Sequence, residues 1–211
     1  MKFKHILIYI LTALLLSCSA SEKSTDTDFS KVLKESRDRI NYMQHIDSAQ
    51  AHESAVNHVV QASTYEQKFE HAKAVLEFMD ALKYDTSAAV YYGIAKNYKK
   101  LYKMDNALNY ALKSVDTDSA FIPALELLAD IYRAELEYLK AVKVYDRILA
   151  LDPPKPDYFI MLQAFLYEFI DKTKAVSLYE ALYEKTDDEY IVTRLESLYE
   201  DLGMDEKRMN I

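Results

Sequence analysis

The chain has 211 residues, of which 34 are acidic and 26 are basic, so its formal net charge is −8. A surface of that sign repels the phosphates of nucleic acids, and we therefore expect no nucleic-acid partner. Two glycines and four prolines are too few for the closely spaced turns of a β-sandwich or barrel, whereas half of the residues are hydrophobic. These proportions predict one α-helical domain with a continuous core.

The first residues have the pattern of an export signal. Lys2 and Lys4 precede a mainly apolar run over residues 6–16. These 11 residues are too few to cross a bilayer, because a transmembrane helix needs about 20. We therefore expect the segment to be cleaved instead of remaining as a transmembrane anchor.

The only cysteine of the chain stands at the end of this run. Leu15-Leu16-Ser17-Cys18 resembles the lipobox of bacterial lipoproteins, in which the cysteine is lipidated and becomes the first residue of the mature protein. The resemblance implies a signal peptide over residues 1–17 and a membrane anchor on Cys18. Each buried methylene of an acyl chain contributes about 0.8 kcal/mol, so two or three chains anchor a protein stably.

The residues that follow Cys18 are small, polar or charged, and they predict a flexible tether over residues 18–28. Ser19 occupies the position at which proteobacterial lipoproteins of the inner membrane typically carry aspartate. By this resemblance, we expect the protein in the cell envelope, at the outer membrane of a Gram-negative bacterium.

Residues 29–87 predict helices that precede the regular part of the chain. An amphipathic stretch comes first, and its apolar residues share one helical face. They are Phe29, Leu33, Ile40 and Met43. A degenerate repeat follows, with a first helix expected around residues 51–62 and a second helix around Ala74, Phe78 and Ala81.

Three consecutive segments then align without a gap at a period of 34 residues. They are residues 88–121, 122–155 and 156–189. Ala107, Ala141 and Ala175 mark the same position in each segment. A period of this length predicts helix pairs that each bury a face against the next pair.

These segments resemble the tetratricopeptide repeat. The matching positions are the large residues Tyr91, Leu125 and Phe159, the aliphatic residues Ile94, Leu128 and Leu162 three positions later, and the three repeat alanines. Gln163 departs from the family's small residue, and Ala111 departs from its aromatic residue. The resemblance implies an all-α fold, a right-handed superhelical solenoid of antiparallel helix pairs.

Residues 190–211 predict a capping helix and a tail. Ile191, Leu195 and Leu198 form its apolar stripe, and Gly203 follows as the expected residue after the helix end. Terminal units of a solenoid need one face in contact with water, which a capping helix provides.

Motifs that carry chemistry are missing from the sequence. His52 and His58 lie six residues apart, whereas two zinc ligands on one helix face need a spacing of four. Two glycines cannot form a glycine-rich phosphate loop, and one cysteine cannot form a thiolate metal cage. We predict that the protein is not an enzyme and has no metal site, cofactor or small-molecule substrate.

The tetratricopeptide resemblance implies that the first helices line a concave groove that binds a partner protein or peptide. The groove residues, matched position by position, are Tyr92, Lys96, Lys99 and Lys100, then Glu126, Asp130 and Arg133, then Ile160, Ala164, Tyr167 and Glu168. We expect a membrane-anchored scaffold that assembles envelope complexes. The alternatives are a regulator that docks a peptidoglycan-processing enzyme and an enzyme with an unrecognised site.

Overall fold

The computed structural model describes residues 48–186, 188–209 and 211. The predictions made for residues 1–47, including the signal peptide, Cys18, the tether and the first amphipathic helix, lie outside the described residues. Residues His52–Ile211 form one compact unit, which contains all of the regular repeats.

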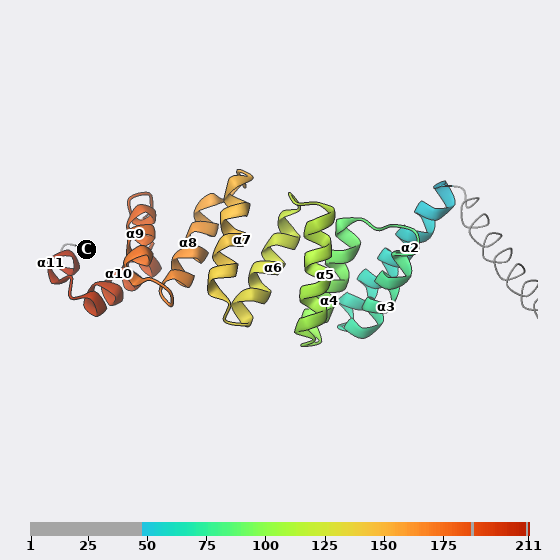
Figure 1. Cartoon of the computed structure of the whole chain (residues 1–211), viewed down its shortest axis with the longest axis horizontal. Coiled ribbons are helices and arrows are strands. Elements are labelled where there is room, and N and C mark those ends of the chain that lie inside the picture. The colour runs from blue at the N-terminus through green and yellow to red at the C-terminus, as the bar shows by residue number, and fades with distance from the viewer. Residues whose placement is uncertain (1–47, 187, 210) are drawn as a thin grey trace, which may run out of the picture. The chain divides into compact units, whose positions relative to one another are not determined.

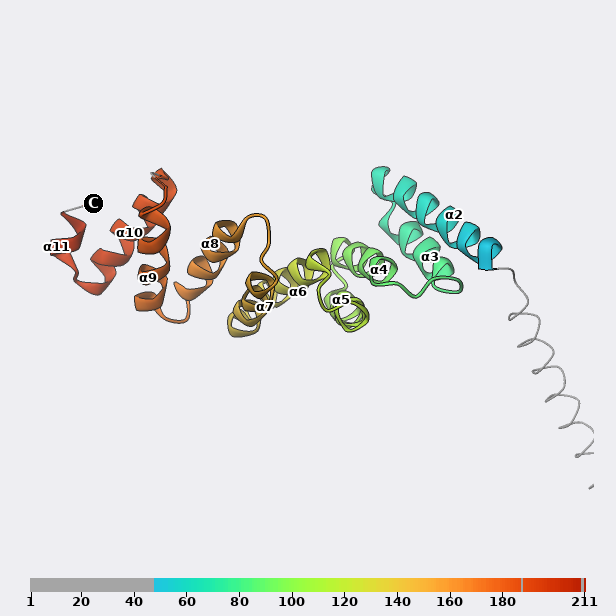
Figure 2. The same ribbon diagram turned by 90° about the horizontal axis from the view of Figure 1, so that it is seen from above.

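The described residues form ten α-helices and no strand, so the predicted all-α class is confirmed. The helices are α2 (Ser48–Gln67), α3 (His71–Ala81), α4 (Ala88–Lys100), α5 (Met104–Thr117), α6 (Ile122–Ala134), α7 (Tyr138–Ala150), α8 (Pro156–Tyr167), α9 (Lys172–Tyr183), α10 (Glu189–Leu202) and α11 (Asp205–Arg208). From α3 to α11, each helix contacts its successor in the chain, which makes the unit a solenoid (Figures 1 and 2). None of the described helices has both the length and the hydropathy needed to cross a bilayer.

The first helix of each regular repeat begins at Ala88, Ile122 or Pro156, and these starts are 34 residues apart. Proline stands in the first turn of α6 and of α8, where its missing N–H has no hydrogen bond to lose. Helix α2 is longer than the expected 51–62, because no glycine or proline interrupts the sequence before its end at Gln67.

Small residues bring the helices of each pair together. Ala107, Ala141 and Ala175 have no exposed surface, and each lies on the second helix of its pair. Gly93 of α4 has a similar role between two pairs, since a Cβ built there would lie 2.6 Å from the ring of Phe78 of α3. Large side chains then fill the space around these contacts, with Tyr145 and Tyr179 almost fully buried. Burial raises the pKa of both phenols above the ordinary value.

The turns inside the first three helix pairs share an unusual backbone. Phe69, Tyr102 and Leu136 all have positive φ values, of 58°, 58° and 61°. A hydrogen bond spanning five residues closes each turn, as between Lys103 N and Tyr98 O at 3.0 Å. This pattern ends a helix with a left-handed residue, and glycine is the usual choice there. Gly203 fills the same position after α10, as predicted, with φ 67°.

Helix α10 covers the end of the regular repeats. Its buried residues Ile191, Leu195 and Leu198 form one cluster with Tyr179 of α9 and Ala164 of α8. The short helix α11 follows Gly203. The apolar stripe predicted for the capping helix is therefore in contact with the preceding pair.

Candidate functional site

A cavity of about 410 Å³ lies between α4, α6 and the turn after α4. Six of the predicted groove residues line it: Tyr92, Lys96, Lys99, Lys100, Glu126 and Asp130. Tyr102, Met104, Pro123 and Leu127 complete the wall. Spacings of three and four residues place the α4 side chains on one face of that helix, while Ile94 and Ala95 are buried in its packing.

An aromatic contact fixes one end of the cavity. The ring of Tyr92 packs edge-on against Phe121, with the centroids 5.7 Å apart. The ammonium group of Lys96 lies 5.7 Å from the centroid of the Tyr92 ring. Tyr92 therefore presents a partly exposed, immobilised ring to the cavity.

Two of the three lysines in the cavity already have partners within the chain. Lys96 pairs with Glu66 of α2 at 2.8 Å, and Lys99 pairs with Asp130 of α6 at 2.6 Å. The buried amide of Asn97 also donates to Glu66, at 2.5 Å, which holds that carboxylate in place. Lys100 is exposed and forms no ion pair with residues 48–186. Among the three lysines of the cavity, Lys100 is thus the one that has no ion pair with another described residue.

The pKa values of the two carboxylates of the cavity are shifted in opposite directions. Burial raises the pKa of Asp130, but the hydrogen bonds and charges of Lys99 and Arg133 outweigh it and lower the pKa overall. Burial, and then the charge of Asp130, raise the pKa of Glu126 above its usual range. No ion pair within the described residues compensates Glu126. It is the carboxylate that gains most from a cationic ligand.

A second, apolar cavity of about 320 Å³ adjoins the first, and Glu126 lines both. Its walls come from Ile122, from the loop Pro153–Lys155 and from Tyr158 and Phe159 at the start of α8. The helical periodicity of the sequence does not predict this cavity, because part of its wall is the loop Pro153–Lys155. Two adjacent prolines followed by aromatic residues were the available signal.

The remaining predicted groove residues lie outside these two cavities. Arg133 is exposed and donates to Asp130 at 3.2 Å. Ile160 packs against the cluster of α9 and α10. The hydroxyl of Tyr167 accepts a hydrogen bond from Lys174 at 2.7 Å. The third repeat therefore adds none of its predicted groove residues to these two cavities.

Two residues of the third repeat do not face outward as predicted. Ala164 has no exposed surface, because it packs in the cluster that α8 forms with α9 and α10. Glu168 has a side chain that is only 7% exposed, and it pairs with Arg194 of α10. Its carboxylate also accepts from the hydroxyl of Tyr179 at 2.8 Å. Both residues belong to the packing of the capping helix.

No protein-family model matches the sequence. No curated protein matches it either. Solved structures do share the fold, at sequence identities that show the fold alone. A crystal structure of MamA protein has a TM-score of 0.66 at 17% identity, covering 75% of this chain and 87% of that chain.

A tetratricopeptide repeat protein from Parabacteroides merdae has a TM-score of 0.66 at 15% identity, covering 74% of this chain and 63% of its own. Pseudomonas aeruginosa pilF has a TM-score of 0.59 at 13% identity, covering 73% of this chain and 71% of its own. The fold is thus an all-α solenoid of the tetratricopeptide type.

Proposed function

We propose that this chain is a lipid-anchored scaffold of the bacterial cell envelope, which holds an extended segment of a partner protein against α4 and α6. The observation that supports this proposal most is that a mixed-charge cavity and an apolar cavity share a wall at Glu126. An extended segment rises about 3.3 Å per residue, so a few residues reach from one cavity to the other.

The chemistry of the walls indicates what such a segment contains. Lys100 suits a carboxylate, and Glu126 suits a lysine or arginine. An apolar side chain fits between Pro153 and Tyr158. Lys96 and Lys99 contribute less, because their intrachain partners would have to be displaced. The proposed ligand is therefore a segment with both charges and an apolar anchor.

Binding by this groove is tested with charge reversal at Lys100. The partner is first captured from detergent-solubilised membranes and identified, and its affinity for purified variants is then measured at low salt. We expect Lys100→Glu to weaken binding by about fivefold or more, since it replaces an attraction by a repulsion. Lys143→Glu is the matched control, because Lys143 is an exposed lysine on α7 away from both cavities.

Tyr158→Ala tests the apolar cavity independently, and loss of that wall should also weaken binding. Normal affinity in both Lys100→Glu and Tyr158→Ala would refute the groove model. The identity of the partner separates the two envelope roles: an assembly component supports the scaffold, and a peptidoglycan-processing enzyme supports the regulator.

The anchor belongs to this proposal and rests on the sequence Leu15-Leu16-Ser17-Cys18. Cells supplied with labelled palmitate should label the wild type and should not label Cys18→Ala. Equal labelling of the two proteins would remove lipidation at Cys18 from the proposal. The groove experiment uses purified protein and does not depend on this outcome.

A further inference from the structure

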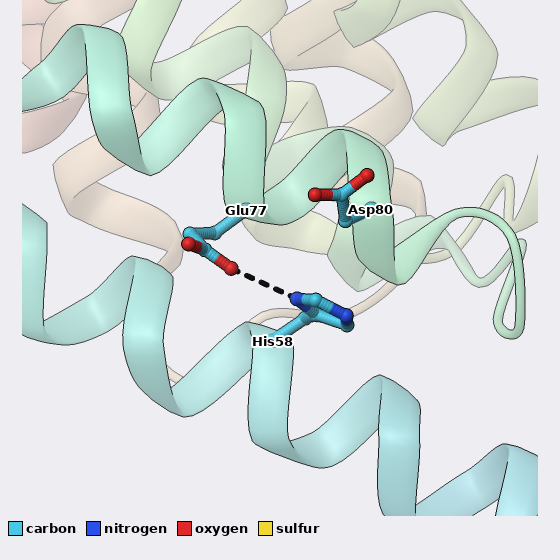
Figure 3. Close-up of side chains that lie close together, drawn as sticks. All are labelled: His58, Glu77 and Asp80. Atoms are coloured by element: carbon cyan, nitrogen blue, oxygen red, sulfur yellow. Dashed lines mark hydrogen bonds and ion pairs between the residues drawn. The ribbon is translucent and has the colours of Figure 1, made fainter.

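Three potential metal ligands meet between α2 and α3. His58 of α2 faces Glu77 and Asp80 of α3, which are three residues apart and share one side of that helix (Figure 3). The Nδ1 atom of His58 lies 2.8 Å from Oε2 of Glu77. One ligand atom from each of the three residues lies within 4.8 Å of the others.

These separations suit a small divalent ion. Zn²⁺ binds imidazole nitrogen and carboxylate oxygen at about 2.0–2.2 Å, which places neighbouring ligands of a tetrahedral centre roughly 3.4 Å apart. The His58–Glu77 contact is shorter than this distance, and the 4.8 Å limit for the set is longer. The ligand atoms therefore already lie close to the spacing that such a centre needs.

The surroundings position the ligands and leave them accessible. The ring of Tyr84 stacks on the ring of His58, with centroids 6.2 Å apart and an interplanar angle of 10°. Lys83 donates to Oδ1 of Asp80 at 2.5 Å, and Oδ2 has no hydrogen bond within the part of the chain that the structure describes, so it remains for an ion. The side chains of His58 and Glu77 are 33% and 25% exposed, which gives an ion a path from solvent.

We propose that His58, Glu77 and Asp80 bind a divalent transition-metal ion, for which Zn²⁺ is the appropriate probe. One imidazole and two carboxylates match the ligand preferences of Zn²⁺ better than those of Ca²⁺, which takes six to eight oxygen ligands. Water completes the coordination.

Such an ion would connect the two helices of the first pair. An ion that binds the folded state and not the unfolded chain stabilises the fold. The spacing of histidines along one helix does not reveal ligands that come from two helices, so this site could not be predicted from the sequence. The metal site is independent of the proposed groove, which lies on α4, α6 and α8.

The test is calorimetric titration of the purified, chelator-treated full chain with ZnCl₂, together with thermal unfolding. We expect one Zn²⁺ site whose affinity falls by at least about tenfold in His58→Ala and in Glu77→Gln. His52→Ala is the matched control, since His52 lies on the same helix outside the cluster, and its affinity should equal that of the wild type. Circular dichroism checks that each variant is folded.

Zn²⁺ should raise the unfolding temperature of the wild type and of His52→Ala, and should not raise that of His58→Ala. Mg²⁺ and Ca²⁺ at the same concentrations should have no such effect. Equal Zn²⁺ affinity in His58→Ala and wild type would overturn the proposal, because any site would then lie elsewhere on the chain. A loss of affinity confined to His52→Ala would overturn it in the same way.

Discussion

The same repeat position has opposite environments at the two ends of the regular array. Lys96, Asp130 and Ala164 are spaced by 34 residues. Lys96 and Asp130 line an open cavity, whereas Ala164 is completely buried in the cluster of α8, α9 and α10. The difference shows that a repeat fixes which way a side chain points, whereas the packing of the helices that follow determines whether that side chain meets solvent.

Exchanging alanine and aspartate between these two positions should give the largest change in the free energy of unfolding. We expect Ala164→Asp to destabilise the protein by about 3–5 kcal/mol, because its carboxylate would be buried without a partner. The reverse change, Asp130→Ala, should cost no more than about 1 kcal/mol, since it removes only partly exposed ion pairs. Urea unfolding measures both. Similar costs for the two variants would contradict the proposed difference in environment.

Alkaline unfolding probes the buried phenols of the two regions. The pKa of Tyr145 and of Tyr179 is raised by burial, so the folded state keeps both protons when the unfolded chain begins to lose them near pH 10. The unfolded state then binds fewer protons, and stability falls as pH rises. The expected slope is about 1.4 kcal/mol per pH unit for each tyrosine.

Below about pH 10, neither phenol should make stability depend on pH. Urea unfolding at pH 9, 10 and 11 should therefore show a steeper loss in the wild type than in Tyr145→Phe. Tyr145→Phe isolates the phenol of α7, and Tyr179→Phe does the same for α9, although it also removes the hydrogen bond to Glu168. Identical pH profiles in wild type and Tyr145→Phe would show that this phenol ionises normally in the folded state.

The smallest expected effect concerns a turn inside a helix pair. Tyr102 has a left-handed backbone and an 87% exposed side chain, so it carries conformational strain with little compensating contact. Tyr102→Gly should stabilise the protein by about 0.5–1 kcal/mol, as the strain exceeds the backbone entropy that glycine loses. Gly203→Ala, at the same position after α10, should change stability by a similar amount in the opposite direction.

The midpoint of urea unfolding separates these two variants, if its slope is unchanged. A destabilised Tyr102→Gly variant would mean that the exposed ring makes a contact worth more than the strain. Gly203 has open space around its Cβ position, so only the backbone conformation is tested there.

The 34-residue period was sufficient to predict the helix pairs and the buried alanines, because both follow from local spacing. It could not predict that Ala164 and Glu168 would be covered, since that depends on where α10 packs. It also missed the partners of the lysines, although Glu66 and Asp130 lie 30 and 31 residues from Lys96 and Lys99. A search for opposite charges separated by about one repeat would have found both pairs.

The apolar cavity illustrates a different limit. Pro153 and Tyr158 were visible in the sequence, but a cavity depends on how the loop before α8 lies against α6. Hydrophobic periodicity carries no information on loop conformation. Residues that terminate helices are therefore also candidates for binding surfaces once the helices are placed.

The strained turns also bear on how the array unfolds. In a linear array, stability is the sum of what each unit contributes alone and what each interface adds. The left-handed backbone at Phe69, Tyr102 and Leu136 lowers the stability that each of three successive pairs has on its own. It does not change the interfaces between the pairs. Units that are poor on their own but well coupled to their neighbours favour an all-or-none transition. We therefore expect these turns to lower the stability of the single helix pairs and to make unfolding of the array more cooperative. The array should then resist opening from one end.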